Sequence, residues 1–181
     1  MKVHDTPLPG LKVVEPAVHG DARGFFLETF QEARFAAAGL PTRFVQDNWS
    51  RSARHTLRGL HFQHPKGQGK LVWCVQGAVY DVAVDVRRRS PTFGQWFGLE
   101  LSAANKTQLW IPPGFAHGFC VISEAADFVY KCTEPYSPAD EGAVRWDDPR
   151  LGIPWPTATP LLSARDARAL PLAEQPHLPE E

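Results

Sequence analysis

The chain has 181 residues, 43% of them hydrophobic and 22% charged, which predicts one globular domain with a substantial core. The formal net charge of -1 argues against nucleic acid or an anionic membrane as the main partner, because both require a basic excess or a basic face. The N-terminus has no apolar leader and no apolar run approaches the ~20 residues of a membrane span, so we expect a cytoplasmic protein.

The first third of the chain combines short strands with one peripheral helix. Alternation and turn residues predict a strand pair over 8–20 and a turn over 20–24. A capping box over 29–32 then predicts a helix over 34–38 that ends at Gly39. Extended segments are predicted over 44–49 and 56–63, separated by a polar loop over 50–54.

The rest of the chain is a succession of strands followed by an irregular end. Strands are predicted over 70–75, 79–86, 96–101, 107–111, 117–122 and 127–133, with a solvated turn over 87–89, a short helix over 163–170 and a mobile tail over 171–181. A strand every ten residues or so is typical of an antiparallel barrel. We therefore expect a mainly β jelly roll with short peripheral helices, formed by residues 1–181 as a single domain.

The three cysteines are expected to be free thiols. Cys74, Cys120 and Cys132 are an odd number, show no CxxC spacing and each lie in an apolar stretch. Buried thiols in a reducing compartment fit this pattern best.

The stretch from residue 56 to residue 72 concentrates chemically active side chains. Strand alternation places His61 on the face opposite Leu60 and Phe62, Arg58 precedes it, and Lys70 begins the next strand. A lone histidine in a strand is usually a hydrogen-bonded core residue. With two cations beside it, His61 becomes a candidate base.

Three histidines raise the question of a metal site. His61 and His64 are three apart, and His117 ends a Pro-x-Gly-x-x-His segment of the kind found in cupin barrels. Metal-binding cupins also carry a His-x-His pair and a later glutamate, and the chain has neither. Residues three apart on a regular strand point to opposite faces, so we predict no metal and a structural role for His64.

Several other polar residues are ambiguous when taken singly. Tyr130 fits a core position in a strand, Asp166 fits the third position of a capping box, and Tyr136 fits either a stacking platform or a packed turn.

A family resemblance connects these residues. From about residue 10 to residue 167 the chain resembles the dTDP-4-dehydrorhamnose 3,5-epimerase family, and the segments that carry the resemblance are 21–26, 44–48, 57–63, 69–72, 90–94, 110–119, 130–131 and 146–149. This resemblance implies a cupin jelly roll that uses neither cofactor nor metal, forms a homodimer by strand exchange, and acts on dTDP-4-dehydro-6-deoxyglucose in the route to dTDP-L-rhamnose.

The resemblance also implies roles for individual residues. His61 corresponds to the base, Asp166 to its partner carboxylate, Tyr130 to the acid and Lys70 to the cation at the substrate carbonyl. The positions that match substrate contacts, with Arg23 and Arg58 expected at the diphosphate and Tyr136 at the thymine, are Arg23, Phe25, Glu28, Gln46, Asn48, Arg58, Lys70, His117, Tyr136, Glu141 and Arg165.

Some positions depart from the family pattern, and other functions stay open. Trp49 stands where many members have histidine, Trp73 where arginine is frequent, and His55 precedes Thr56 where a small residue is usual. The alternatives are an epimerase acting at carbon 3 or carbon 5 alone, a metal-dependent cupin enzyme, and a non-catalytic nucleotide-sugar binding module.

Overall fold

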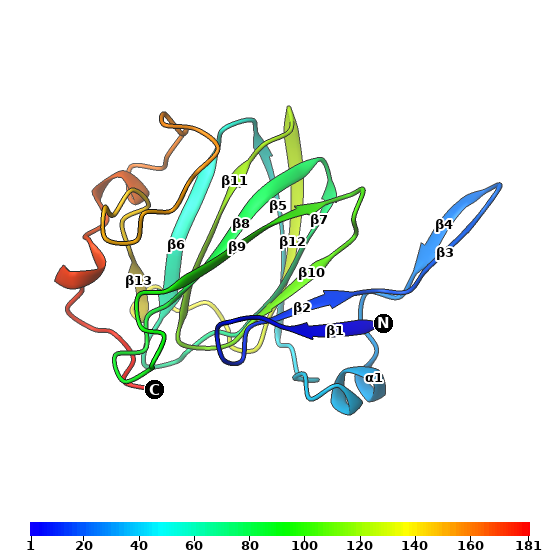
Figure 1. The fold of residues 1–181 in the computed structure, drawn as a ribbon, viewed down its shortest axis with the longest axis horizontal. Coiled ribbons are helices and arrows are strands. Elements are labelled where there is room, and N and C mark those ends of the chain that lie inside the picture. Colours follow the sequence, from blue (N-terminus) through cyan, green and yellow to red (C-terminus); the bar gives the residue numbers. More distant parts are fainter.

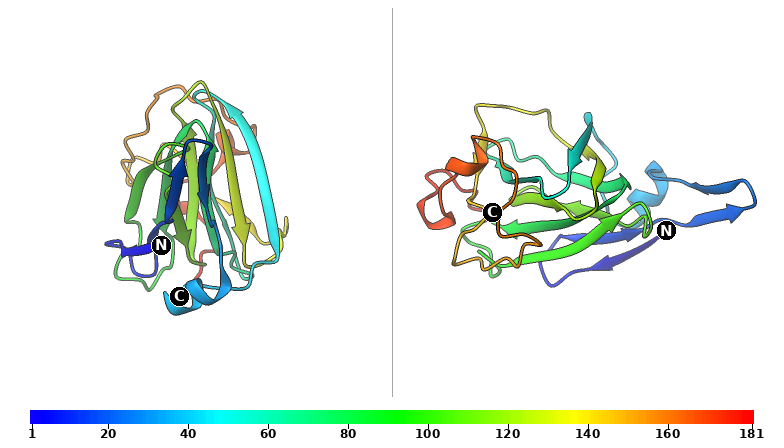
Figure 2. Two further views of the ribbon diagram at one scale, coloured as in Figure 1. Left: turned by 90° about the vertical axis from the view of Figure 1, so that its right-hand side faces the viewer. Right: turned by 90° about the horizontal axis from the view of Figure 1, so that it is seen from above.

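Two antiparallel sheets face each other and form a barrel in the computed structural model, which describes residues 1–181 (Figures 1 and 2). The larger sheet has the strand order β1 (Lys2–Asp5), β2 (Lys12–Glu15), β10 (Gln108–Ile111), β7 (Lys70–Gln76), β12 (Ala125–Cys132) and β5 (Gln46–Ala53). The smaller sheet has the order β13 (Glu141–Ala143), β6 (Leu57–Gln63), β11 (Phe115–Val121), β8 (Ala78–Asp85) and β9 (Trp96–Ser102). The predicted mainly β, jelly-roll architecture is confirmed.

Alternating apolar side chains build the core between the sheets. The largest cluster contains 14 buried residues, including Val72 and Phe128 from the larger sheet and Phe119 from the smaller one. Burying one such side chain contributes ~1.5–3 kcal/mol, so this layer holds the two sheets together. Polar side chains between the sheets, among them His61, Lys70 and His117, line a cavity.

A two-stranded hairpin and the helix leave the barrel on the side of the N-terminus. The hairpin β3 (Val18–Asp21) and β4 (Gly24–Leu27) projects away from the body, with Phe25 63% and Phe26 70% exposed (Figure 1). Helix α1 (Glu32–Ala37) covers part of the outer face of the larger sheet. Its N-cap is Gln31, whose side chain accepts a hydrogen bond from the backbone N–H of Arg34. The capping box predicted over residues 29–32 is therefore wrong.

The predicted polar loop over 50–54 is also wrong, because β5 continues to Ala53. This edge strand pairs with β12 along its whole length, and its polar side chains meet partners on both faces. Arg51 forms an ion pair with Asp127, and Ser52 accepts a hydrogen bond from Arg58. The polar residues of this segment therefore belong to an edge strand that borders a cavity.

The C-terminal region contributes two short 3-10 helices, η1 (Asp166–Arg168) and η2 (Leu172–Glu174), where the sequence predicts one helix over 163–170. The tail packs against the barrel: Leu172 and Leu178 are buried, and Pro179 and Glu180 accept backbone hydrogen bonds from residues 88 and 89. None of the helices has the length and apolar character needed to cross a lipid bilayer.

Candidate active site

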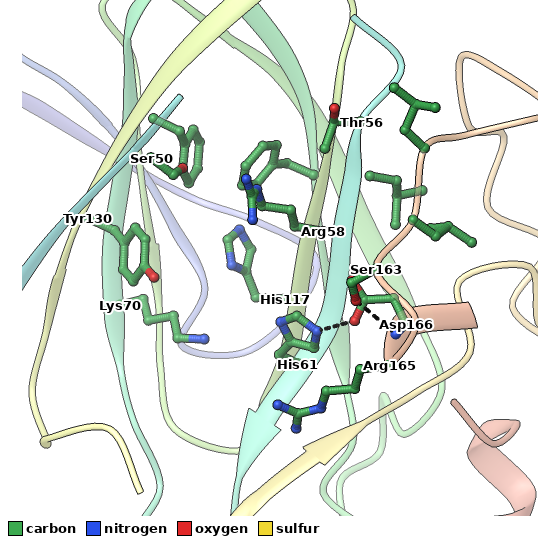
Figure 3. Close-up of a pocket in the computed structure, with 15 residues that line it drawn as sticks. Ser50, Thr56, Arg58, His61, Lys70, His117, Tyr130, Ser163, Arg165 and Asp166 are labelled. Carbon is green, nitrogen blue, oxygen red and sulfur yellow. Dashed lines mark hydrogen bonds and ion pairs between the residues drawn. The ribbon is translucent and has the colours of Figure 1, made fainter. Parts of the chain in front are cut away.

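A groove between the two sheets collects most of the residues singled out in the sequence (Figure 3). Its inner part is a cavity of about 510 Å³, and its outer part has a volume of about 360 Å³. His61, Lys70 and Tyr130 line both parts, so the two parts adjoin at these three side chains. The inner part is lined in addition by Ser50, Arg58, His117, Leu161, Leu162, Ser163, Arg165 and Asp166, and the outer part by Gln46, Asn48, Gln68, Tyr136 and Glu141.

A break in the strand alternation of β6 brings Arg58 and His61 to the same cavity. Across the β6–β11 pair, Arg58 lies opposite Phe119 and His61 opposite His117, so β6 carries one residue more than β11 in this interval. Such a β-bulge turns the following side chains to the other face. The expected position of His61 on the face opposite Leu60 and Phe62 is confirmed, because those two side chains are buried in a hydrophobic cluster whereas His61 lines the cavity. The regular alternation expected from residue 57 to residue 61 is wrong.

Two glycines make this bulge possible. Gly59 has φ +136°, and a Cβ atom added to it would lie 2.4 Å from the Cα of Gly118 on β11. Neither the dihedral nor the space admits a side chain. The contact between Gly59 and Gly118 thus sets where β6 changes face and orients His61.

His61 is paired with Asp166. The Nε2 atom of His61 lies 2.6 Å from Oδ1 of Asp166, which reaches β6 from η1 (Figure 3). The Asp166 side chain is 4% exposed, and its backbone N–H is held by Ser163 Oγ. Burial raises the pKa of Asp166, but the hydrogen bond and charge of His61 outweigh it and hold this pKa below its usual value. Because Asp166 occupies Nε2, Nδ1 is the nitrogen of His61 that can exchange a proton in the cavity.

Tyr130 and Lys70 come from the opposite sheet. Tyr130, on β12, stands across the cavity from His61, and Lys70, at the start of β7, lies next to Tyr130 and extends toward His61 (Figure 3). Burial raises the pKa of Tyr130 and lowers that of Lys70. No interaction joins Lys70 to the other lining side chains, so its ammonium group is free for a ligand (Figure 3).

A second histidine–aspartate pair lies beside the first. His117 Nε2 is 2.9 Å from Oδ2 of Asp81, which is fully buried on β8. The His117 ring stacks on Phe128 and lines the inner cavity. We did not predict Asp81 from the sequence; the available signal was a carboxylate in a strand of alternating buried valines.

The outer part of the groove is tied together by Glu141. Its Oε2 atom accepts from the Tyr136 hydroxyl at 2.5 Å and from the Arg165 guanidinium. Gln46 accepts from the backbone of Tyr136 and donates to Asn48. The Tyr136 ring remains half exposed, which leaves one face open to a planar ligand.

Three of the predicted substrate contacts do not reach this groove. Arg23 is paired with Asp21 at the tip of the hairpin, Phe25 is exposed on β4, and Glu28 is paired with Arg34. They lie on the projecting side of the molecule. His64 lies outside the groove as well, and no three His, Cys, Asp or Glu side chains gather closely enough to hold a metal ion.

Proton-transfer groups on facing walls, with a cation between them, suit a reaction in which a proton leaves one face of a substrate and returns on the other. Fold and site thus describe an isomerase of the epimerase class in a jelly-roll barrel. A family model described as dTDP-4-dehydrorhamnose 3,5-epimerase matches residues 5–174. The chain belongs to this family.

Individual relatives agree over nearly the whole chain. The dTDP-4-dehydrorhamnose 3,5-epimerase of Salmonella typhimurium is 54% identical, over 99% of this chain and 100% of that protein. A 3,5-epimerase from Legionella pneumophila, solved in complex with dTDP-4-keto-L-rhamnose, superposes with a TM-score of 0.95 at 50% identity, covering 99% of this chain and 98% of the other. A dTDP-4-dehydrorhamnose 3-epimerase of Streptomyces niveus is 45% identical, over 96% of this chain and 85% of that protein.

Proposed function

We propose that this protein inverts carbons 3 and 5 of dTDP-4-dehydro-6-deoxy-D-glucose to give dTDP-4-dehydro-L-rhamnose, a step of dTDP-L-rhamnose biosynthesis. The observation that carries the proposal is the opposition of the His61–Asp166 pair on one sheet and Tyr130 on the other, across a single cavity. The relatives from Salmonella and Legionella support the same substrate and outcome.

Lys70 is assigned to the substrate carbonyl. A ketone at carbon 4 acidifies the protons on carbons 3 and 5, so one enolate oxygen serves both inversions. A preorganised positive group at such an oxygen is worth ~3 kcal/mol in the transition state. Lys70 suits this role because it lies next to Tyr130 and extends toward His61 with no partner among the lining residues.

His61 is assigned as the base and Tyr130 as the acid. Asp166 orients the imidazole and stabilises the imidazolium formed when Nδ1 takes the proton from carbon. The raised pKa of Tyr130 keeps its hydroxyl protonated, ready to donate to the opposite face of the enolate. A single residue on one face would exchange the proton without inverting the carbon.

The outer groove is assigned to the nucleotide. The half-exposed Tyr136 offers a stacking face for thymine, and Gln46 and Asn48 offer amide groups at its edge. Arg165 contacts Glu141 beside Tyr136, whereas Arg58 lies toward Ser52 on the far side of His117 (Figure 3). We therefore assign the diphosphate to Arg165. Arg58, which the resemblance places at the diphosphate, is assigned instead to the part of the groove that would hold the sugar.

A homodimer would complete the site. Arg23 and Phe25 lie on a hairpin that projects from the barrel and exposes two phenylalanines, which supports the insertion of this hairpin into a second copy of the chain. Arg23, Phe25 and Glu28 would then reach the groove of the other subunit. The three buried free cysteines support a reducing, cytoplasmic location.

Proton NMR in heavy water tests the reaction. Incubation with dTDP-4-dehydro-6-deoxyglucose should place solvent deuterium at carbon 3 and carbon 5, with formation of the L-rhamno product. Deuterium at carbon 3 alone would replace the proposal with a 3-epimerase, the activity named for the Streptomyces niveus relative. His61→Ala should abolish exchange while dTDP binding changes little, and full exchange in this variant would remove His61 as the base.

A further inference from the structure

Asp81 is a buried carboxylate with one oxygen unexplained. Oδ2 accepts from His117, but Oδ1 is buried without any hydrogen-bond partner. Leaving such an atom unpaired is costly, so a buried carboxylate oxygen without a protein partner calls for an explanation. Asp81 lies behind the inner cavity, so the explanation is to be sought there.

The charge of Asp81 acts on Lys70. Burial lowers the pKa of Lys70, and three acidic groups counteract this: Cys132, Glu141 and Asp81. Burial raises the pKa of Cys132 to about 11, so its thiol is uncharged near neutral pH. The carboxylate of Glu141 already accepts from Tyr136 and Arg165. Of these three groups, Asp81 is the one that also contacts a histidine of the cavity wall, His117.

The contact with Asp81 also orients His117. The imidazole is held through Nε2 on one side and stacks against Phe128, with ring centroids 6.1 Å apart and planes 20° apart. Nδ1 is then the only ring nitrogen left for a ligand. Because His117 lies directly opposite His61 in the β6–β11 pair, two imidazoles with fixed orientations stand side by side on the cavity wall.

We propose that Asp81 is a positioning residue of the active site, which fixes the imidazole of His117 through Nε2 and leaves Nδ1 for the substrate. It acts through His117 and does not itself touch the substrate. The proposal rests on the proposed function, because it places the sugar of the substrate in the inner cavity that His117 lines.

Asp81→Asn tests this with a matched control on the same strand. The variant keeps the size of the side chain and removes its charge, and Asp85→Asn does the same at a buried carboxylate that binds Arg87, Ser90 and Thr92 away from the cavity. We expect kcat to fall about 10-fold or more in Asp81→Asn with dTDP affinity within about twofold, since dTDP lacks the hexose that would occupy the inner cavity. Asp85→Asn should keep the kcat of the unmodified enzyme even if its melting temperature drops.

The pH profile gives a readout that a purely structural role would not move. The titratable groups around Lys70 are Asp81 on β8, Cys132 and Tyr130 on β12, Glu141 on β13, and His61 and His117 on β6 and β11. Asp81 is among the groups that counteract the effect of burial on the pKa of Lys70, so its removal should move the alkaline limb of kcat to lower pH. In Asp85→Asn it should stay in place. An unchanged kcat and alkaline limb in folded Asp81→Asn would overturn the proposal.

A measurement on the unmodified enzyme covers the case in which Asp81→Asn does not fold. Nitrogen-15 NMR should find the proton of His117 on Nε2, in a hydrogen bond to Asp81, and the Nδ1 signal should shift when substrate or product binds. A neutral His117 that carries its proton on Nδ1 would refute the proposal. Failure of the proposed function is a separate result, because the unmodified enzyme would then show no exchange at carbon 3 or carbon 5.

Discussion

Replacing Asp166 with asparagine is the most direct test of the base. The amide has the shape of the carboxylate but no charge, and its NH2 group can also donate to Nε2 of His61. In that orientation the imidazole proton moves to Nδ1, the nitrogen that should accept a proton from the substrate. The substitution therefore removes both the charge that stabilises the imidazolium and the contact that selects the reactive tautomer.

The size of the effect follows from the contact distance. Nε2 and Oδ1 are 2.6 Å apart. Placing the two charge centres roughly 4 Å apart at an effective dielectric constant of about 20 gives ~4 kcal/mol. The His61 side chain is 28% exposed, so solvent screens part of this energy. We expect a loss of about 2–3 kcal/mol in transition-state stabilisation, which is a fall of roughly 30- to 150-fold in kcat.

The assay is the initial rate of deuterium incorporation at carbon 3 under saturating substrate. Asp85→Asn is the control, because Asp85 is also buried but accepts from Arg87, Ser90 and Thr92, outside the groove. It should lose stability and keep its rate. A folded Asp166→Asn enzyme with kcat within about threefold of the unmodified enzyme would contradict the proposed pairing, since ~0.7 kcal/mol is far below the expected loss.

Three further predictions address assembly, nucleotide binding and acid stability. Co-refolded His61→Ala and Arg23→Ala chains should regain about a quarter of full activity, because half of the dimers are mixed and one of their two sites is intact; no recovery would place Arg23 in its own subunit's site. Tyr136→Ala should weaken dTDP binding by about 1–3 kcal/mol in calorimetry, since stacking on its exposed face is lost, and unchanged affinity would move the thymine elsewhere. Burial raises the pKa of Asp85, but hydrogen bonds from Arg87, Ser90 and Thr92 lower it overall. Its carboxylate therefore stabilises the fold above a pH of about 4 and loses this effect as pH falls through the lowered pKa. Asp85→Asn should flatten the fall in melting temperature on acidification, and an equally steep fall would show that other groups control it.

Much of the fold follows from local patterns. Alternating apolar residues locate most of the barrel strands within one or two residues, because burying one face of each strand imposes a period of two. The same rule fails where polar side chains lie inside. Ser50 and Ser52 face the barrel interior from an edge strand beside the cavity, so the polar sequence of this strand resembles that of a loop. The three-residue strand β13 is too short to show any period.

The site depends on contacts that no local pattern contains. His61 and Asp166 are 105 residues apart, and the sequence connects them only through a family resemblance. The side of the strand on which Arg58 lies depends on the bulge at Gly59, which requires knowing that Gly118 is opposite. The packed tail was equally hidden, since the buried Leu172 and Leu178 stand among exposed polar residues and prolines.

The segment that carries Asp166 is fastened at both ends to the sheet that carries the base. Leu161 bridges to Thr56 just before β6, and Leu170 bridges to Val144 just after β13. Gln175 then binds the carbonyl of Leu170 and that of Ala143. Residues 161–175 therefore hold a catalytic group in place against β6 and β13. A deletion that removes residues 170–175 would act on the position of Asp166, and so on the reaction itself.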